Sequence, residues 1–592
     1  MNPSTALGTV LADELMRCGL REAVIAPGSR SAPLAMALHA AASRPGSALR
    51  LHVRIDERSA SFLALGLAKA SGRPVAVVCT SGTAAAHFHA AVIEADEAGV
   101  PLLVLTADRP PELRGTGANQ AIDQVKLYGS AARWFCEVGT PENRPGQAAY
   151  WRSLACQAWA IAAGGAAAPP GPVHLNLPLR EPLVPGLADT VSAGGPAGAD
   201  GSSTGEWCEP LDGRPGGAPW TRIAGPGPAA GTALPVAWPV LELDWTERGV
   251  VVAGDGTADP EGVAALAAEA GWPLLAEPSS GARHGPAALG CYQFLLESAA
   301  FIGTHEPDVI VSAGRPGLSR AQLALLRRSR SPAVRHIVLT QGAGRWSDPA
   351  RAATDVAARV VLRGAQAASA GWLSSWRAAD AAARQAADEV LGSAARLSEP
   401  LLARDLAAAL PPGALLWAAS SMPARDLDRH MAPRPDVRVL ASRGASGIDG
   451  LVSSALGAAL SHQADGGGPA VALLGDLALL HDAPGLVLGP AEPRPDLCLM
   501  VVNNDGGGIF STLEQAAFPD SFERVFGTPH GADLAGLAAA AGLPYSRLDE
   551  VAGLPAVLGG TRLRLVEVVT DRAEGAKLRA ALAEAAVAAL VS

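Results

Sequence analysis

Short runs of apolar, often β-branched residues recur along this chain, and each is followed by small or polar residues and then by a helical pattern. Residues 22–29 (EAVIAPGS), 74–83 (PVAVVCTSGT) and 101–110 (PLLVLTADRP) are examples. This alternation predicts βαβ units around parallel sheets. Ligands of open parallel sheets bind beyond the carboxyl ends of the strands. The residues that end these runs are therefore where we expect chemistry.

The pattern occurs in three successive blocks of a 592-residue chain, which is too long for a single core. We expect an α/β fold with three consecutive doubly wound parallel-sheet domains. A Gly/Pro/Ala-rich stretch separates the first two blocks, and an Ala- and Arg-rich helical stretch separates the last two. The predicted boundaries are a first domain at 1–185, a linker or insertion at 186–240, a central domain at 241–365, a helical connector at 366–400 and a last domain at 401–592.

Composition excludes several classes of protein. Hydrophobic residues make up 49% and charged residues 18%, so large cores are expected and general disorder is not. A net charge of −10, without a basic run, argues against nucleic-acid binding. Seven scattered cysteines without a C-x-x-C motif predict reduced thiols rather than a disulfide framework or a zinc site. No apolar run approaches the roughly 18 residues of a membrane span, and we expect a cytoplasmic protein.

Two predicted strands of the last block end in residues that suit a metal–diphosphate site. The run VALLGDLALL delivers Gly475 and Asp476, and LMVVNNDGGG delivers Asn504 and Gly506. Mg²⁺ prefers six oxygen ligands and usually shares its shell with phosphates and water. The Asp476 carboxylate, the Asn504 side-chain oxygen and the Gly506 carbonyl would supply three of them. The alternative is a helix cap beside an ordinary glycine loop.

A second Gly-Asp pair, Gly254–Asp255, lacks these companions. No asparagine pair follows it at the same spacing, so we expect a turn of the central domain. It also fails as a dinucleotide fingerprint, because Asp259 stands where G-x-G-x-x-G requires glycine. A nicotinamide dehydrogenase is therefore the least supported alternative.

The Gly-Asp pair followed at this distance by an Asn pair resembles the signature of thiamine-diphosphate-dependent enzymes. Gly475-Asp476-Leu477, which replaces the Gly-Asp-Gly of the signature, narrows the resemblance to one family within this class. Further motifs that carry the resemblance are APGSRSAPL (26–34), TADRPPELRGTGANQAIDQ (106–124), ASRGASGIDG (441–450) and NNDGGGIFSTLE (503–514). With these motifs the chain resembles the family of 2-succinyl-5-enolpyruvyl-6-hydroxy-3-cyclohexene-1-carboxylate synthases of menaquinone biosynthesis. The similarity reaches from the N-terminus to about residue 530 and is weak in the central block.

This resemblance implies a transferase (carboligase) that uses thiamine diphosphate and Mg²⁺, with Mn²⁺ as a substitute. The implied reaction is decarboxylation of 2-oxoglutarate and 1,4-addition of the succinyl carbanion equivalent to isochorismate, with release of CO₂. Glu57, in the segment RIDERSASFLALGLAKA, matches the catalytic glutamate that bonds the cofactor's aminopyrimidine ring, and an apolar pocket would raise its proton affinity. The alternative is that Glu57 lies in an ordinary solvent-exposed turn. The implied cofactor-binding set is Glu57, Ile448, Gly475, Asp476, Asn504, Gly506 and Ile509.

The family also implies substrate residues and an assembly. Both substrates are dianions, for which arginine supplies charge and bidentate geometry. We expect isochorismate near four of these residues, Arg30, Arg109, Asn119 and Gln120. We expect the 2-oxoglutarate-derived chain near Arg425 and Arg443. A homodimer or homotetramer with active sites at the subunit interface is implied. The full substrate-binding set is Ser29, Arg30, Arg109, Asn119, Gln120, Arg320, Ser421, Arg425, Arg443, Phe510 and Leu513.

One departure from the family pattern concerns Ser319, which stands where a lysine is expected beside Arg320. Without this lysine, one substrate contact of the family is left unassigned in this chain. Two other functions also stay open at this point. One is another thiamine-diphosphate 2-oxo-acid decarboxylase or carboligase, which the arginine set disfavours. The other is a non-catalytic homologue that binds thiamine diphosphate, which the retained Glu57, Asp476 and Asn504 disfavour.

Overall fold

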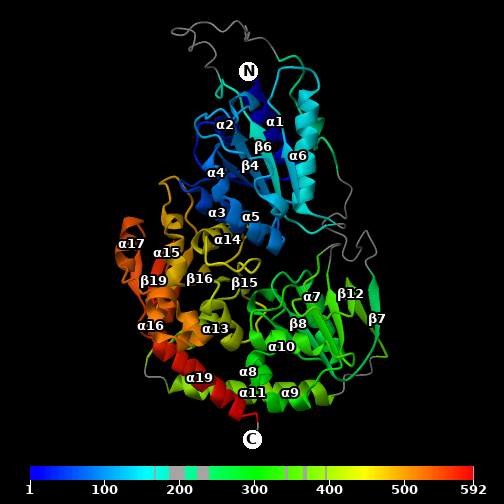
Figure 1. The fold of residues 1–592 in the computed structure, drawn as a ribbon, viewed down its shortest axis with the longest axis vertical. Helices are drawn as coiled ribbons and strands as arrows, with labels where there is room; N and C mark the ends of the chain where they lie inside the picture. Colours follow the sequence, from blue (N-terminus) through cyan, green and yellow to red (C-terminus); the bar gives the residue numbers. More distant parts are fainter. Residues whose placement is uncertain are drawn as a thin grey trace. The chain divides into compact units, whose positions relative to one another are not determined.

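The computed structural model describes residues 1–165, 168–185, 207–222, 239–340, 345–364, 370–393 and 396–590. Its contacts define two compact units. The first comprises Met1–Pro235, Ser453–Ser461 and Asp482–Pro493, and the second comprises Val236–Val452, His462–His481 and Arg494–Ser592. All strand pairs within the described sheets are parallel, which confirms the predicted fold class (Figure 1). None of the described helices is both long and apolar enough to cross a bilayer.

The first unit contains a six-stranded sheet in the order β2-β1-β3-β4-β6-β5. Its inner strands are buried along their whole length, as parallel strands covered on both faces must be. Helices α1, α2 and α6 pack together on one face, and α3, α4 and α5 form the second helical layer (Figure 1). The strands are β1 (Glu22–Ile25), β2 (Arg50–Val53), β3 (Val75–Cys79), β4 (Leu102–Asp108), β5 (Trp134–Glu137) and β6 (Pro172–Pro178), and the helices are α1 (Pro3–Cys18), α2 (Ala32–Ala42), α3 (Glu57–Ser71), α4 (Thr83–His87), α5 (His89–Ala98) and α6 (Gln147–Ala163).

The last block of the chain builds a second six-stranded sheet, in the order β15-β14-β16-β17-β19-β18. Both six-stranded sheets have the same topology. From one edge to the other, their strands are the second, first, third, fourth, sixth and fifth in chain order. The strand order therefore reverses between β14 and β16, where doubly wound sheets bind ligands. The strands are β14 (Leu415–Ala418), β15 (Arg438–Leu440), β16 (Ala470–Gly475), β17 (Leu497–Asn503), β18 (Tyr545–Arg547) and β19 (Arg564–Val569), and the helices are α12 (Glu399–Ala409), α13 (Met422–His430), α14 (Leu451–Ala464), α15 (Asp476–His481), α16 (Pro519–Phe522), α17 (Leu534–Ala540), α18 (Leu554–Leu558) and α19 (Arg572–Ala588).

The central sheet has the order β12-β11-β10-β8-β9, and β7 pairs separately with β13. Helix α19 packs along α11, where Leu582 and Ala586 join the core around Trp376 (Figure 1). The strands are β7 (Val240–Asp244), β8 (Gly249–Ala253), β9 (Leu274–Ala276), β10 (Val309–Ala313), β11 (Arg335–Leu339), β12 (Asp355–Ala357) and β13 (Arg359–Arg363), and the helices are α7 (Pro260–Ala270), α8 (Tyr292–Glu297), α9 (Ala299–Thr304), α10 (Arg320–Arg328) and α11 (Ala370–Gly392).

The crevice at the switch point of the central sheet, between β8 and β10, is closed by the chain itself. Asp255 and Arg315 form an isolated β-bridge, and the Arg315 guanidinium lies 2.9 Å from Asp255 Oδ2. A Cβ atom on Gly254 would lie 2.2 Å from the Arg315 carbonyl carbon, so the two backbones touch. The Gly254–Asp255 pair is thus a turn packed against a second loop.

Part of the Gly/Pro/Ala-rich stretch packs against α1 and α6 within the first unit. The Glu209 carboxylate accepts hydrogen bonds from Gly146 N–H (2.8 Å) and Ala148 N–H (2.7 Å) at the start of α6. The Arg17 guanidinium of α1 donates to the Arg214 carbonyl at 2.8 Å. These contacts belong to residues 207–222, whereas 186–206 and 223–238 of the predicted linker lie outside the described residues. The predicted domain boundaries stay predictions.

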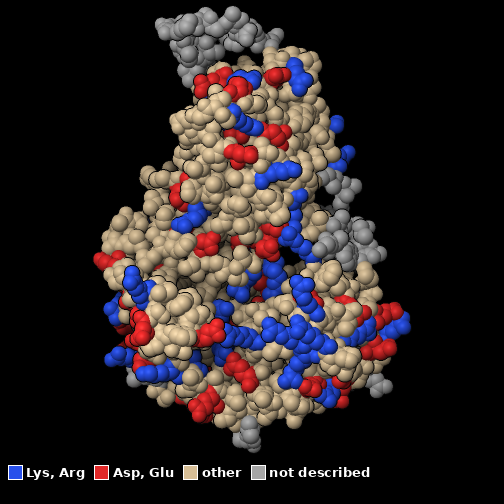
Figure 2. Space-filling model, in the orientation of Figure 1, with Lys and Arg blue, Asp and Glu red and all other residues tan. Residues whose placement is uncertain are grey.

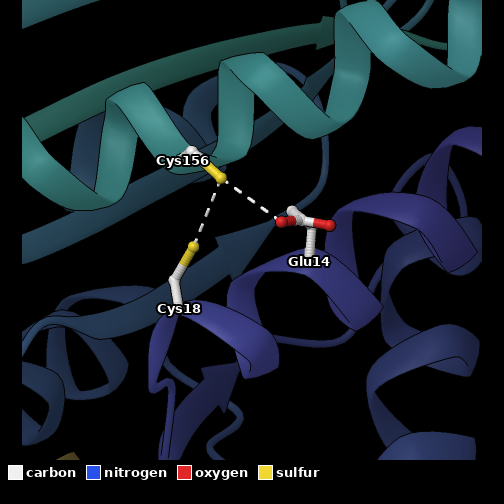
Figure 3. A group of neighbouring side chains, drawn as sticks. All are labelled: Glu14, Cys18 and Cys156. Atoms are coloured by element: carbon white, nitrogen blue, oxygen red, sulfur yellow. Dashed lines mark hydrogen bonds between the residues drawn. The ribbon is translucent and has the colours of Figure 1, made fainter. Parts of the chain in front are cut away.

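Glu14 and Cys18 of α1 meet Cys156 of α6 (Figure 3). The Cys18 and Cys156 sulfurs are 3.6 Å apart, and the Cys156 thiol donates to Glu14 Oε1 at 3.3 Å. The Arg152 guanidinium already pairs with the buried Glu14 carboxylate. Burial raises the pKa of both thiols, so both stay protonated at neutral pH. The group is a hydrogen-bonded chain between two helices, and all seven cysteines of the protein are free thiols.

The closed crevice of the central sheet gives a stability prediction. Gly254→Ala is expected to lower the free energy of unfolding by about 1–3 kcal/mol, because its Cβ would collide with backbone that has no room to move. Gly303→Ala is the matched control, because nothing lies within 4 Å of a Cβ at this position of α9. That control should be neutral or slightly stabilising. Equilibrium denaturation of both variants measures the difference, and equal stabilities would contradict the packing described.

Candidate active site

A cavity of about 490 Å³ opens at the carboxyl edge of the β14–β17 sheet in the second unit. Its volume lies in the range of small-molecule sites. It is lined by residues that follow four neighbouring strand ends, as expected for a doubly wound sheet. Of the residues predicted from the sequence, those that line it are Ser421, Arg425, Arg443, Ile448, Gly475, Asp476, Asn504, Gly506, Ile509, Phe510 and Leu513.

Asp476 lies at the junction of β16 and α15, with 2% of its surface exposed. Its Oδ2 atom accepts hydrogen bonds from the N–H groups of Asn504 (3.2 Å) and Gly506 (2.9 Å), and His530 Nε2 lies 3.2 Å away. Its Oδ1 atom accepts from Leu477 N–H at 2.7 Å. A carboxylate oxygen has two lone pairs, so Oδ1 keeps the capacity to bind a cation.

Asn504 and Gly506 follow β17 and complete a set of oxygen donors. The Oδ1 atom of Asn504 is buried and has no hydrogen-bond partner in the described part of the chain. Gly506 has φ 132°, and a Cβ atom there would lie 1.9 Å from the Gly527 carbonyl oxygen. Only glycine fits this position. An unsatisfied amide oxygen, a carboxylate and a glycine carbonyl are hard ligands of the kind that Mg²⁺ takes, so these residues fit the predicted metal.

Two arginines add positive charge to the same cavity. Arg425 lies in the first turns of α13, and Arg443 follows β15. Burial, and then the neighbouring charge of Arg443, lower the pKa of the Arg425 guanidinium. Neither guanidinium has a carboxylate within salt-bridge distance among the described residues. Two guanidiniums without salt bridges to described residues, in one cavity, suit a negatively charged ligand.

The rest of the cavity wall is largely apolar. Ile509 and Phe510 belong to the 3₁₀ turn Gly508–Thr512, and Leu513 follows it directly. Ile448 lies on the loop between β15 and α14 and is half-buried. Ser421 precedes α13 with φ 76°, which turns the chain sharply after β14. Apolar walls of this kind exclude water from bound reactants.

Glu57 lies in the first unit, as the first residue of α3. Asp56 caps the helix by accepting a hydrogen bond from Ser59 N–H at 2.7 Å. Residues 59–68 of the helix are buried, as the apolar pattern predicted. Burial and the Glu57 carboxylate together raise the pKa of the Cys79 thiol, which ends the neighbouring strand β3. Glu57 is itself half-buried in the described chain.

The predicted isochorismate residues gather at the carboxyl edge of the first sheet. Arg30 is buried after β1 and donates to the Leu179 carbonyl at 2.9 Å. Arg109 follows β4, and its Nε donates to the Asn119 carbonyl at 3.0 Å. Asn119, Gln120 and Ser29 are exposed. Apart from Arg320, the candidate residues therefore form two groups, one at a sheet edge of each unit.

Arg320 does not line the cavity. It is exposed at the start of α10, where Arg327 and Arg328 are also exposed, and Figure 2 shows basic side chains over this helix. Ser319, which replaces the expected lysine, caps α10 by accepting from Gln322 N–H at 3.1 Å. Serine is a favoured residue at this position, so the departure from the family pattern has a structural role here.

Three buried or half-buried residues near the cavity were not predicted from the sequence. His530 contacts Asp476, Glu399 lines the cavity, and Glu277 holds the loop before α10 through the N–H groups of Gly317 and Leu318, both at 2.8 Å. None of them lies in the motifs that contain the predicted site residues. Glu399 precedes a proline at the start of a helix, which in sequence is an ordinary N-terminal turn.

Comparison with known proteins agrees with this geometry. Residues 5–127 match the sequence model described as thiamine pyrophosphate enzyme, N-terminal TPP binding domain. This match indicates the class of thiamine pyrophosphate enzymes. A protein of Thermobifida fusca named 2-succinyl-5-enolpyruvyl-6-hydroxy-3-cyclohexene-1-carboxylate synthase is 58% identical over 100% of both chains. Proteins with this name from Saccharopolyspora erythraea and Mycobacterium avium are 47% and 41% identical over at least 97% of each chain. The chain belongs to this family of synthases, and the similarity includes the central block.

Glu277 gives a prediction for the pH dependence of stability. Burial, and then the nearby Asp428 charge, raise its pKa from 4.5 to about 7. The folded state therefore binds more protons than the unfolded state between pH 4.5 and about 7, and stability falls as the pH rises through this window. Glu277→Gln should remove this pH-dependent loss of stability. The free energy of unfolding of the variant, relative to that of the wild type, should therefore rise with pH up to about pH 7. Denaturation at several pH values measures it, with exposed Glu269→Gln as the control; parallel curves for all three proteins would contradict it.

Proposed function

We propose that the protein is the transferase that joins 2-oxoglutarate to isochorismate with loss of CO₂, forming 2-succinyl-5-enolpyruvyl-6-hydroxy-3-cyclohexene-1-carboxylate. The observation that carries the proposal is the pair of arginines without ion-pair partners beside the oxygen donors Asp476 and Asn504 in one cavity of the described chain. The printed names of the full-length relatives support it.

Asp476, Asn504 and Gly506 would hold Mg²⁺, or Mn²⁺ in its place, and through the metal the diphosphate of thiamine diphosphate. Thiamine diphosphate, when bound, supplies the electron sink that decarboxylation of a 2-oxo acid requires. Ile448 and Ile509 would shape the apolar space around it. Glu57 would hydrogen-bond the aminopyrimidine ring and hold a proton there, which is the role of a general acid–base group.

The arginines would orient two dianionic substrates. Arg425 and Arg443 would bind the carboxylates of 2-oxoglutarate, since they lie in the cavity that holds the metal ligands. Arg30, Arg109, Asn119, Gln120 and Ser29 would bind isochorismate. Ser421, Phe510 and Leu513 would line the path of the reacting carbons, and Arg320 is a weaker candidate because it is exposed on α10.

We further propose a homodimer or homotetramer in the cytoplasm, in which Glu57 of one subunit and Asp476 of another act on the same cofactor. Support for the assembly comes from the family resemblance. Support for the compartment comes from the seven free thiols.

The reaction itself is tested by incubating the protein with Mg²⁺, thiamine diphosphate, 2-oxoglutarate and isochorismate. The expected product contains a new carbon–carbon bond. An aldehyde formed equally well with and without isochorismate would favour a simple decarboxylase instead, and intact substrates would refute the proposal.

A complementation experiment tests the shared site. Asp476→Ala should abolish magnesium-dependent uptake of thiamine diphosphate in calorimetry, and Glu57→Gln should keep uptake but lose turnover. Neither variant should be active alone. When the two are co-expressed, mixed dimers keep one intact site, so about a quarter of the wild-type activity is expected. A co-expressed mixture without activity would show that both residues act within one subunit.

Separate measurement of the two substrates tests the arginine assignment. Arg443→Ala should raise the KM for 2-oxoglutarate at least roughly tenfold, since a charged bidentate contact is lost. Arg109→Ala should leave decarboxylation, followed with an artificial electron acceptor, close to wild type while raising the KM for isochorismate. The reverse pattern would exchange the two assignments.

A further inference from the structure

The side-chain amide of Asn504 is held at one end only. Its Nδ2 group donates to Glu399 Oε1 at 2.7 Å, whereas its Oδ1 atom is buried without a partner in the described residues. A Cβ atom on Gly508 would lie 2.7 Å from Nδ2, so the glycine leaves room for the NH₂ end. The contacts thus define which end of the amide faces Glu399.

Glu399 is in turn fixed by donors on both of its oxygens. Arg579 of α19 donates to Oε2, and the Thr570 hydroxyl donates to Oε1 at 3.1 Å. The same guanidinium donates through Nε to Asp426 Oδ1 at 3.0 Å and through Nη2 to Asp426 Oδ2 at 2.6 Å. Glu399 and Asp426 are 6% and 2% exposed. Glu399 is therefore a buried, charge-paired acceptor held in one position.

An ionised carboxylate accepts hydrogen bonds and has none to give. If the Asn504 amide were inverted, its oxygen would face Glu399 Oε1, and two acceptors would meet in a buried place at a cost typical of an unmade hydrogen bond. In the observed orientation, the Asn504 amide directs its oxygen away from Glu399.

We propose that Glu399 is a positioning residue that holds the Asn504 amide with its oxygen toward the divalent cation. The inference rests on the proposed function, because the cation belongs to the proposed cofactor site. Arg579 and Asp426 support the same arrangement through Glu399.

The neighbouring asparagine provides a matched comparison. Asn503 Nδ2 donates to Glu567 Oε1 at 2.6 Å, and Glu567 is 8% exposed, so the two asparagine–glutamate pairs resemble each other. The oxygen of Asn503, however, accepts from Asp505 N–H at 3.2 Å. Asn503 is satisfied at both ends, and the unsatisfied oxygen distinguishes Asn504.

The test measures metal binding directly, by the electron paramagnetic resonance signal of free Mn²⁺ during titration of the protein with saturating thiamine diphosphate. In Glu399→Gln, Arg579 still requires an acceptor and takes the glutamine oxygen. The glutamine NH₂ then faces Asn504 and favours the inverted amide. We expect Mn²⁺ affinity to fall about 10–100-fold, while Glu567→Gln stays within about twofold of wild type.

A double variant separates positioning from a general loss of structure. In Glu399→Gln/Asn504→Asp, the glutamine NH₂ donates to one oxygen of the introduced aspartate, and the other oxygen of that carboxylate faces the cation. Mn²⁺ affinity should recover to within about tenfold of wild type, whereas Asn504→Asp alone, with two carboxylates facing each other, should bind worse than the double variant.

The outcomes are distinct. Unchanged affinity in Glu399→Gln, or a double variant no better than either single one, overturns the positioning role. A wild type that binds no Mn²⁺ with thiamine diphosphate overturns the proposed function itself. Thermal unfolding of the metal-free proteins shows whether each variant is folded, and a Glu399→Gln protein that fails to fold leaves the double variant as the deciding measurement.

Discussion

The carboxylate of Asp476 joins two strand ends, and the chemistry of the cavity depends on that junction. Its Oδ2 atom accepts the N–H groups of Asn504 and Gly506, so the loop after β17 cannot relax without leaving two N–H groups unpaired. These bonds hold an amide side chain and a glycine carbonyl at the rim of the cavity. Gly506 tolerates no side chain there, because the Gly527 carbonyl already occupies the space.

Two sheets of one strand order carry different side chains at their carboxyl edges. The β1–β6 sheet presents Arg30 and Arg109, whereas the β14–β19 sheet presents the oxygen donors Asp476 and Asn504 together with Arg425 and Arg443. The central sheet has the reversal of strand order that would form a crevice, but Asp255 and Arg315 close it. Topology therefore determines where a ligand is able to bind, and the residues at each edge determine whether one does.

The inner strands could be predicted from the sequence, and so could the position of the candidate cation ligands at strand ends. Long apolar runs define strands buried on both faces, and Asp476, Asn504 and Gly506 follow such runs directly. The edge strand β18 (Tyr545–Arg547) is short and exposed, so no apolar run marks it. Glu399 was not predicted because its partners are distant in sequence, and only folding brings them together. The site roles of all these residues stay predictions.

Arg579 reaches Glu399 across 180 residues of chain. Because a ribosome delivers polypeptide from one end, β16 and β17 emerge long before α19, and the cavity they form has its oxygen donors before it has the arginine that steadies them. Completion of the proposed cation site is in this way tied to synthesis of α19. A chain interrupted ahead of that helix would present a complete set of motifs and a loosely held amide.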